Sequence, residues 1–298
     1  MSSLATDYRV ELTQEEVQYF DDNGFVGPFP LFSDAEDWRK LRQRVENEAI
    51  GTVSDVYGFE TGRDRYLDCP SVYEMISQSS ISNRLQQLLG PDLLVWRSAF
   101  FYKPAGAPET VWHRANLFKE YVEHAILEPP DINDLFQLTV WIAIDDATLD
   151  NGCVQFISGG TNKEYFVQKT SAPDAAPNIK EDGKSSFGYD KKGFFGYDLK
   201  VDFELDPNRV VNMECASGEF FIFDQRAIHG SLPNKTDSRR VGMNFRTIKT
   251  DVRAYRHFLD DNKIEHYGRT FNLERWGCLL LSGEDDGNNR IVTPPSYS

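Results

Sequence analysis

The spacing of hydrophobic positions changes character near residue 90, from a helical period to short apolar runs. Before this point apolar residues recur every three or four positions, which is typical of amphipathic helices. Thr13-Gln14-Glu15-Glu16 has the form of a capping box and predicts a helix that runs to Asn23-Gly24. Ser33 to Glu36 opens a second helix, and a third covers Ile81 to Leu89. Helices are therefore predicted within residues 13–90.

From Leu93 onward the apolar residues come in short segments that are rich in aromatic and β-branched side chains. Turn residues such as Asp150-Asn151-Gly152 and Pro233-Asn234-Lys235 separate these segments. Many short strands of this kind predict a sandwich or a jelly-roll barrel, so the expected fold class is mainly β with flanking helices. Strands are expected over Phe25–Phe29, Leu93–Tyr102, Leu138–Ile144, Val154–Ile157, Glu219–Phe223 and Val241–Ile248.

One long segment interrupts this pattern. Residues 159 to about 206 are polar and show little β signal, and a loop of this length in a compact domain indicates a lid or a binding loop. Within it Phe187–Asp190 recurs as Phe195–Asp198, which favours a local aromatic hairpin; an aromatic flap over an active site is the functional alternative. We expect a single domain over residues 1–298, with helices over 13–90, a jelly-roll core over about 93–250 and the lid loop over about 159–206.

Net charge and cysteine content limit which binding partners and which cellular compartment can be expected for this protein. Lys+Arg 32 against Asp+Glu 47 gives a net charge of −15, which disfavours binding to nucleic acid or to an anionic membrane surface. The four cysteines show no zinc or disulfide spacing, and no window reaches the roughly 18 apolar residues of a membrane span. The N-terminus has no basic segment followed by an apolar run. We therefore expect a soluble, cytoplasmic protein that binds neither nucleic acid nor membrane.

The five histidines limit where a metal could bind. His124, His257 and His266 lie in polar or charged segments and are interpreted as structural or exposed residues. His113 and His229 each follow a predicted strand, which is a position at the rim of a barrel. A single histidine is an ordinary hydrogen-bonded residue more often than a ligand, so the local motifs around these two decide the interpretation.

The segment Trp112-His113-Arg114-Ala115 has the form of an iron site that lacks one ligand. Mononuclear non-haem Fe(II) oxygenases hold the metal with two histidines and one carboxylate, which usually stands two residues after the first histidine. Here that position is Ala115, whose methyl group cannot bind a metal. A coordination position would then open where a small anion such as chloride could bind iron directly, and hydroxylation would become halogenation.

The second histidine belongs to a longer motif. His229-Gly230-Ser231-x-Pro233-Asn234 followed by Arg240 resembles the distal-histidine signature of the phytanoyl-CoA dioxygenase superfamily of Fe(II)/2-oxoglutarate enzymes. The resemblance implies that His229 binds iron and that Arg240 pairs with the far carboxylate of 2-oxoglutarate, a task that suits a planar guanidinium. Arg239 would point to the opposite face of a strand and is the less favoured anchor.

Further segments are similar to the aliphatic halogenases of the syringomycin-biosynthesis type. They are Trp96-Arg97 with Phe100-Phe101, Thr110-x-Trp112-His113-x-Ala115, Leu138–Trp141, Asn151–Ile157, Gly193–Asp198 and Ile264–Gly268. The similarity runs from the Gly24–Phe29 segment nearly to the C-terminus. It implies a double-stranded β-helix, that is a cupin-like jelly roll, and a reaction that uses Fe(II), 2-oxoglutarate, O2 and chloride.

The resemblance assigns roles to individual residues. His113 and His229 would bind iron, and Ala115 would leave room for chloride. Arg240 would hold 2-oxoglutarate, with Thr139 and Trp141 lining its pocket.

Three further residues stand at positions that surround the halide in the family: Thr110, Phe118 and Arg246. Arg246 would act on the halide without contacting it directly. Glu120 departs from the family, in which a neutral polar residue stands near the halide.

The implied reaction is chlorination of an unactivated aliphatic carbon in natural-product biosynthesis. The substrate of first choice is an amino acid tethered to a peptidyl carrier protein. The basic run Arg39, Lys40, Arg42 and Arg44 could form a docking face for such a carrier, although a solvated helix surface is the favoured interpretation. The alternatives are a halogenase of a free small molecule such as an amino acid or nucleotide, a 2-oxoglutarate-dependent hydroxylase with water in the gap, and a non-catalytic binding protein.

Overall fold

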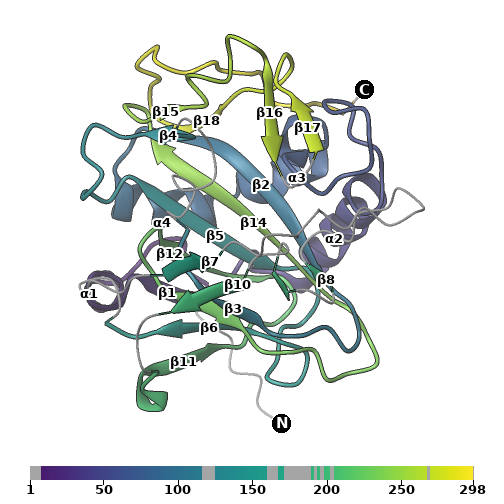
Figure 1. The fold of residues 1–298 in the computed structure, drawn as a ribbon, viewed down its shortest axis with the longest axis vertical. Coiled ribbons are helices and arrows are strands. Elements are labelled where there is room, and N and C mark those ends of the chain that lie inside the picture. Colours follow the sequence, from purple (N-terminus) through teal and green to yellow (C-terminus); the bar gives the residue numbers. More distant parts are fainter. Residues whose placement is uncertain are drawn as a thin grey trace.

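Two antiparallel β-sheets that face each other form the centre of the molecule (Figure 1). The computed structural model describes residues 8–115, 125–159, 167–170, 189–190, 193–194, 198–201, 205–266 and 269–297. The larger sheet has six strands in the order β1-β12-β5-β14-β2-β18, and the smaller has four in the order β11-β6-β13-β3. This arrangement confirms the predicted fold class, a mainly β jelly roll with flanking helices.

The strands have the following bounds. The larger sheet contains β1 (Phe25–Pro30), β12 (Glu219–Asp224), β5 (Gln137–Ala143), β14 (Arg240–Lys249), β2 (Leu93–Lys103) and β18 (Leu279–Ser282). The smaller sheet contains β11 (Val210–Met213), β6 (Val154–Ile157), β13 (His229–Ser231) and β3 (Thr110–His113). Short pairs are β4 (Leu127–Glu128) with β15 (Arg253–Ala254), β7 (Val167–Thr170) with β10 (Asp198–Val201), β8 (Tyr189–Asp190) with β9 (Gly193–Phe194), and β16 (Lys263–His266) with β17 (Arg269–Asn272).

Helices from the N-terminal third pack on one face of the larger sheet, and in Figure 1 α4 lies behind its strands. They are α1 (Gln14–Asn23), α2 (Ala35–Ala49), α3 (Pro70–Ile76) and α4 (Ser79–Leu89), with 3-10 turns η1 (Arg65–Leu67) and, before β11, η3 (Pro207–Arg209). Both hydrogen bonds of the predicted capping box between Thr13 and Glu16 are present, and Gly24 ends α1 in the left-handed conformation at φ 79°.

Alternation along the central strands separates an outer from an inner face of the larger sheet. On β5, Val140 packs into the core beneath the helices, whereas Trp141 belongs to the cluster between the two sheets. The same alternation holds on β14. One set of side chains points toward the helices: Val241, Met243 and Phe245. The alternate set points toward the smaller sheet: Arg240, Asn244 and Arg246. The inner face therefore carries polar and cationic side chains at regular intervals.

An aromatic cluster fills the space between the sheets next to this polar row. Trp141 stacks on Phe221 with ring centroids 5.1 Å apart, and Phe25 stacks on Phe156 at 4.4 Å. Burial of such rings contributes to packing and keeps water away from the adjacent polar groups. The cluster thus forms a rigid, apolar wall for the site.

The predicted strands β2, β5, β6, β12 and β14 begin and end within one residue of their expected bounds. The prediction missed α3, which at seven residues is too short to show a helical period, and the strands β3, β4, β11, β13 and β15 to β18. His113 and His229, which were expected to follow strands, lie within β3 and β13. Within residues 159–206, the segment predicted as a lid or binding loop, the described residues include two short antiparallel pairs, β7 with β10 and β8 with β9. The second pairing joins Tyr189-Asp190 to Gly193-Phe194 in antiparallel register.

Candidate active site

His113 and His229 are directly opposed residues on β3 and β13, and their ring centroids lie 4.2 Å apart. Each Nδ1 faces the carbonyl oxygen of the residue two positions earlier, Val111 at 2.9 Å and Ala227 at 3.0 Å. Because a carbonyl oxygen can only accept, each neutral ring carries its proton on Nδ1 and its lone pair on Nε2. The backbone thus selects on both rings the tautomer that binds a metal through Nε2.

The surroundings of this pair keep both rings neutral. Phe223 and Phe156 lie 4.7 Å and 5.9 Å from the His229 ring, centroid to centroid. Desolvation lowers the pKa of His113 to about 4 and holds the pKa of His229 well below its usual value, and the positive charge of Arg246 acts in the same direction. Metal binding requires unprotonated imidazole, so neither ring has to lose a proton at neutral pH.

A short turn positions His229. The Oδ1 atom of the buried Asp224 accepts hydrogen bonds from the backbone N–H groups of Arg226 and Ala227, both at 2.7 Å. The carbonyl of the same Ala227 accepts from His229 Nδ1. The end of β12 therefore holds the carbonyl that orients the His229 ring.

Ala115 stands two residues after His113 and is buried, with 3% of its surface exposed. Within the ranges that the structure describes, no three His, Cys, Asp or Glu side chains come together as a metal-binding group. The described residues therefore offer two imidazole nitrogens and a methyl group. They fit an iron ion that takes its remaining ligands from small molecules.

Arg240 lies at the other end of the inner face and is 2% exposed. Its Nη2 donates to the carbonyl oxygen of Gly152 at 2.7 Å, and its guanidinium carbon lies 5.4 Å from the centre of the Trp141 ring. Gly242 allows this ring to lie flat on the strand, since a Cβ there would come within 2.1 Å of Trp141. The predicted anchor is thus held at a defined place by a carbonyl and an aromatic face.

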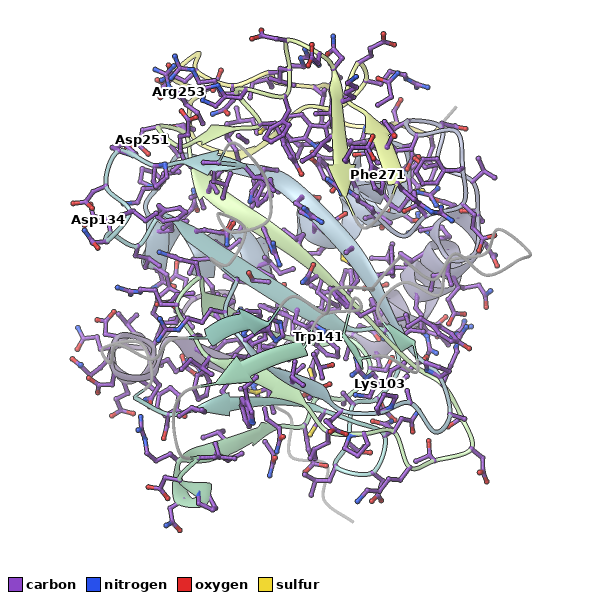
Figure 2. The ribbon with its side chains drawn as sticks, in the orientation of Figure 1. Lys103, Asp134, Trp141, Asp251, Arg253 and Phe271 are labelled. Atoms are coloured by element: carbon purple, nitrogen blue, oxygen red, sulfur yellow. The ribbon has the colours of Figure 1, made fainter. Side chains whose placement is uncertain are left out.

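Lys103 is a fully buried cation beside Arg240 that the sequence analysis missed. The two residues are cross-strand partners on β2 and β14. Figure 2 labels Lys103 at the end of β2. Lys103 Nζ donates to Ser231 Oγ at 2.8 Å, and Ser231 Oγ donates to Thr110 Oγ1 at 2.8 Å. Desolvation, with the charge of Arg240, lowers the pKa of Lys103 to about 7. A signal was available: Lys103 directly follows the predicted strand Leu93–Tyr102 and continues its inward register, where a lysine is unusual.

Two buried cations side by side suit the carboxylate of a bound acid, because a negative charge between them relieves their repulsion. Thr139 adds a polar group on the same face: its Oγ1 is buried and makes no hydrogen bond within the described residues. A buried hydroxyl without a partner is uncommon in folded proteins and points to a polar ligand. The cation pair fits one carboxylate of a small acid such as 2-oxoglutarate, and Thr139, the cross-strand partner of Arg246, offers a separate polar contact on the same face.

The structure brings together most of the predicted site residues. His113, His229 and Ala115 lie at one place, Arg240 and Trp141 at another, and Arg246 and Thr139 are cross-strand partners on the same inner face. Thr110 is buried and accepts its hydrogen bond from Ser231, on the side of Lys103. Phe118, Glu120 and His124 lie outside the described residues. His257 is exposed and lies 2.7 Å from Glu128, Nε2 to Oε1.

The basic run on α2 is neutralised by carboxylates. Arg39 and Lys40 pair with Glu36, Arg42 pairs with Asp145, and Arg44 pairs with Glu74. Arg239 also lies on this surface and pairs with Glu46 and Asp145. These pairs agree with a solvated helix surface and leave no excess positive charge for an acidic partner. In the described ranges no helix combines the length and the apolar character that crossing a bilayer requires.

The chain matches the phytanoyl-CoA dioxygenase (PhyH) family over residues 20–242, and it belongs to this family. Its structure resembles that of CytC3 with Fe(II) and alpha-ketoglutarate, an alternative name for 2-oxoglutarate. The identity is 28% and the TM-score 0.66, with 95% of this chain and 93% of that chain covered. The structure of a non-heme monooxygenase, ThoJ, has the same fold at 19% identity and a TM-score of 0.63, over 94% of this chain and 88% of that chain.

Two curated relatives are similar in sequence. "Dioxygenase lolE1" of Epichloe uncinata is 23% identical over 246 residues, which is 78% of this chain and 81% of the relative. "Probable alpha-ketoglutarate-dependent hypophosphite dioxygenase" of Stutzerimonas stutzeri is 24% identical over 242 residues, 76% and 75% of the two chains. The chain is an enzyme of the Fe(II)/2-oxoglutarate-dependent dioxygenase class, an oxidoreductase.

Proposed function

We propose that this enzyme chlorinates an unactivated aliphatic carbon, with Fe(II), 2-oxoglutarate, O2 and chloride. The observation that carries the proposal is the buried Ala115, at the position where Fe(II) oxygenases have their carboxylate ligand. A methyl group leaves that ligand position to a small anion. The reactants are the substrate with its C–H bond, chloride, O2, 2-oxoglutarate and one proton. The products are the chlorinated substrate, succinate, carbon dioxide and water.

The residues of the chain would divide the binding of the cofactors between them. His113 and His229 would bind iron through Nε2, and Arg240 with Lys103 would hold the far carboxylate of 2-oxoglutarate. When bound, the iron supplies the oxidising power that removes a hydrogen atom from the substrate and returns chlorine. The protein contributes placement, because the group transferred to carbon depends on how close the substrate lies to the halide.

Arg246 distinguishes this proposal from a hydroxylase with water in the gap. Its charge lowers the pKa values of both histidines, so its field reaches the metal position. A positive field near the third ligand position favours chloride over neutral water.

The test uses the visible spectrum of the anaerobic protein with Fe(II) and 2-oxoglutarate, titrated with chloride. We expect a charge-transfer band that chloride shifts in a saturable way, and we expect Ala115→Gly to keep this response. Ala115→Asp should keep the band and lose the chloride response, because the carboxylate takes the halide position. A wild-type band that ignores chloride would favour the hydroxylase, and the absence of any band would favour the binding protein.

A further inference from the structure

The inner face of the larger sheet has one end at the histidine pair and another at the cation pair. Thr139 of β5 is paired with Phe223 of β12, and the Phe223 ring lies 4.7 Å from the His229 ring, centroid to centroid. The pairing of Lys103 with Arg240 marks the other end of the face. A molecule that contacts both the cation pair and a metal on the histidines must therefore cross the face between these two ends.

Asn244 lies between these two ends, on the inner face of β14. Its cross-strand partner on β5 is Trp141, two residues from Thr139, and the centre of the Trp141 ring lies 5.4 Å from the guanidinium carbon of Arg240. Its partner on β2 is Ala99, whose side chain is only a methyl group. Asn244 is therefore placed along the path from the cation pair to the histidine pair, beside a small side chain that leaves room.

Thr139 and Asn244 are buried polar side chains that the described part of the chain does not satisfy. Thr139 is fully buried, and its Oγ1 has no hydrogen-bond partner within the described residues. Asn244 is 8% exposed, and within the same ranges its side-chain amide takes part in no hydrogen bond. Buried polar groups in folded proteins are nearly always paired, and each exception needs an explanation. Two exceptions on one face point to a polar ligand.

The two side chains are close enough to contact the same small group. Thr139 is directly opposite Arg246, two residues from Asn244 along β14, so Thr139 and Asn244 are diagonal neighbours. Diagonal neighbours in a sheet lie roughly 7–8 Å apart, which leaves space for one carboxylate between two short side chains. The Thr139 hydroxyl and the Asn244 Nδ2 can each donate a hydrogen bond to it.

We propose that Asn244 and Thr139 bind the near carboxylate of 2-oxoglutarate, the one next to the keto group, by one hydrogen bond each. The inference rests on the proposed function, which places the far carboxylate at Arg240 and Lys103. Because the two carboxylates stand at opposite ends of the molecule, the near carboxylate then lies toward the histidine pair. The resemblance placed Thr139 in the 2-oxoglutarate pocket without a partner atom, whereas Asn244 had no predicted role.

These two hydrogen bonds would fix the orientation of the near carboxylate. Hydrogen bonds are directional, and two donors on neighbouring strands hold a planar carboxylate in one plane. The orientation of 2-oxoglutarate at the metal decides which ligand positions are left for O2 and chloride. Asn244 and Thr139 would therefore contribute to the placement of the reacting groups as well as to the affinity for 2-oxoglutarate.

The experiment compares 2-oxoglutarate with 4-oxopentanoate, which keeps the keto group and the far carboxylate but has a methyl group in place of the near carboxylate. The affinity of the complete anaerobic protein with Fe(II) for each compound is measured by calorimetry, with competition against 2-oxoglutarate where binding is weak. We expect Asn244→Ala and Thr139→Val each to weaken 2-oxoglutarate binding by roughly 10-fold, the loss of a hydrogen bond to a charged group, and to leave 4-oxopentanoate unchanged. Equal weakening of both compounds, or no change in either, would overturn the proposal.

A change of charge at Asn244 gives the effect a sign. Asn244→Asp keeps the size of the side chain but replaces the donor with a negative charge, so it should weaken 2-oxoglutarate binding more than Asn244→Ala does. Binding of 4-oxopentanoate, which has no charge at this end, should change little. Asn212→Ala is the matched control, because Asn212 is an exposed amide on β11, hydrogen-bonded to Gln155, and should leave both affinities unchanged. Tighter binding of 2-oxoglutarate by Asn244→Asp would contradict the assignment.

The stability of the protein without ligand separates a binding role from a structural role. Thr139→Val removes a hydroxyl that has no partner within the described ranges and nearly keeps the shape of the side chain. The ligand-free variant should therefore be at least as stable as the wild type in urea denaturation. A marked loss of stability would mean that the hydroxyl supports the fold, and it would overturn the role of Thr139 in binding.

Failure of this inference and failure of the proposed function give different results. If Arg240→Ala weakens both compounds but Asn244→Ala and Thr139→Val do not distinguish them, the far anchor stands and the inference is wrong. If Arg240→Ala weakens neither compound, the far anchor is wrong and the inference falls with it. If the variants distinguish the compounds as expected but the charge-transfer band ignores chloride, the chlorination is wrong and the inference stands.

Discussion

Lys103 and Arg240 occupy directly opposed positions on β2 and β14, and both side chains are buried between the two sheets. Lys103 Nζ donates to Ser231 Oγ, and Arg240 Nη2 donates to the Gly152 carbonyl oxygen. Two cations in a region of low dielectric attract an anion far more strongly than either would at the surface. This pair explains why one end of the inner face suits the far carboxylate of 2-oxoglutarate.

Replacement of Arg240 by alanine should weaken 2-oxoglutarate binding by roughly 10- to 100-fold, the loss expected when charge-assisted hydrogen bonds are removed. Titration of the anaerobic charge-transfer band with 2-oxoglutarate measures this. Arg239→Ala is the matched control, because Arg239 is ion-paired on the surface and should leave the affinity unchanged. An unaltered affinity in Arg240→Ala would show that the anchor lies elsewhere.

The affinity for 2-oxoglutarate should fall as the pH rises from about 6.5 to 9. Without ligand, Lys103 has a pKa lowered to about 7, so it loses its proton over this range. A bound carboxylate favours the charged form and raises the pKa, so binding takes up a proton and is weakened when protons are scarce. Lys103→Met should remove most of this dependence, and calorimetry in buffers of different ionisation enthalpy should detect the proton uptake in wild type. A pH dependence equal in both proteins would contradict the assignment.

Ala115→Asp should abolish chlorination, because the new carboxylate occupies the ligand position proposed for chloride. Iron should still bind, since both histidines remain. Product analysis by mass spectrometry with a turned-over substrate checks the outcome, with Ala115→Gly as the control that keeps the position open. Chlorinated product from the aspartate variant would rule out direct halide binding at this position.

Gly152→Ala should destabilise the fold by about 2–4 kcal/mol and weaken 2-oxoglutarate binding. Gly152 has φ +94°, and a Cβ would lie 2.5 Å from the Leu232 carbonyl oxygen and 2.8 Å from Lys103 Cε. Gly106→Ala is the matched control: φ is +72°, but nothing lies within 4 Å of its Cβ, so it should cost only about 1 kcal/mol. Urea denaturation of both variants measures the difference, and equal losses would show that the close contact has no energetic effect.

The limits of prediction are visible at the histidine pair. The motifs around His113 and His229 marked both residues as candidates, because each motif is a local string of residues. The 4.2 Å between their rings follows from the pairing of β3 with β13, strands that are far apart in the sequence. No local pattern specifies such a pairing, since the register depends on hydrogen bonds and side-chain packing across the sheet.

Lys103 and Arg97 illustrate the same limit. Each lies within a strand that the hydrophobic pattern predicted almost to the residue, yet neither was assigned a role. Their importance comes from their cross-strand partners, Arg240 and Arg246, which the register of β2 against β14 supplies. A charged residue in a strand acquires a function only when its neighbour on the next strand is known.

The sequence by itself determined the positions of α1, α2, α4 and the long strands, the mainly β class and the residues of the two histidine motifs, because periodicity, caps and short motifs depend on neighbours along the chain. Only the tertiary structure decided which side chains lie opposite one another between the two sheets: the neutral histidine pair, the Lys103 and Arg240 pair, and Arg97 with Arg246. These groupings require strands separated by many residues to align in one register. That alignment is selected by the burial of a whole face at once, and therefore by the packing of the complete fold.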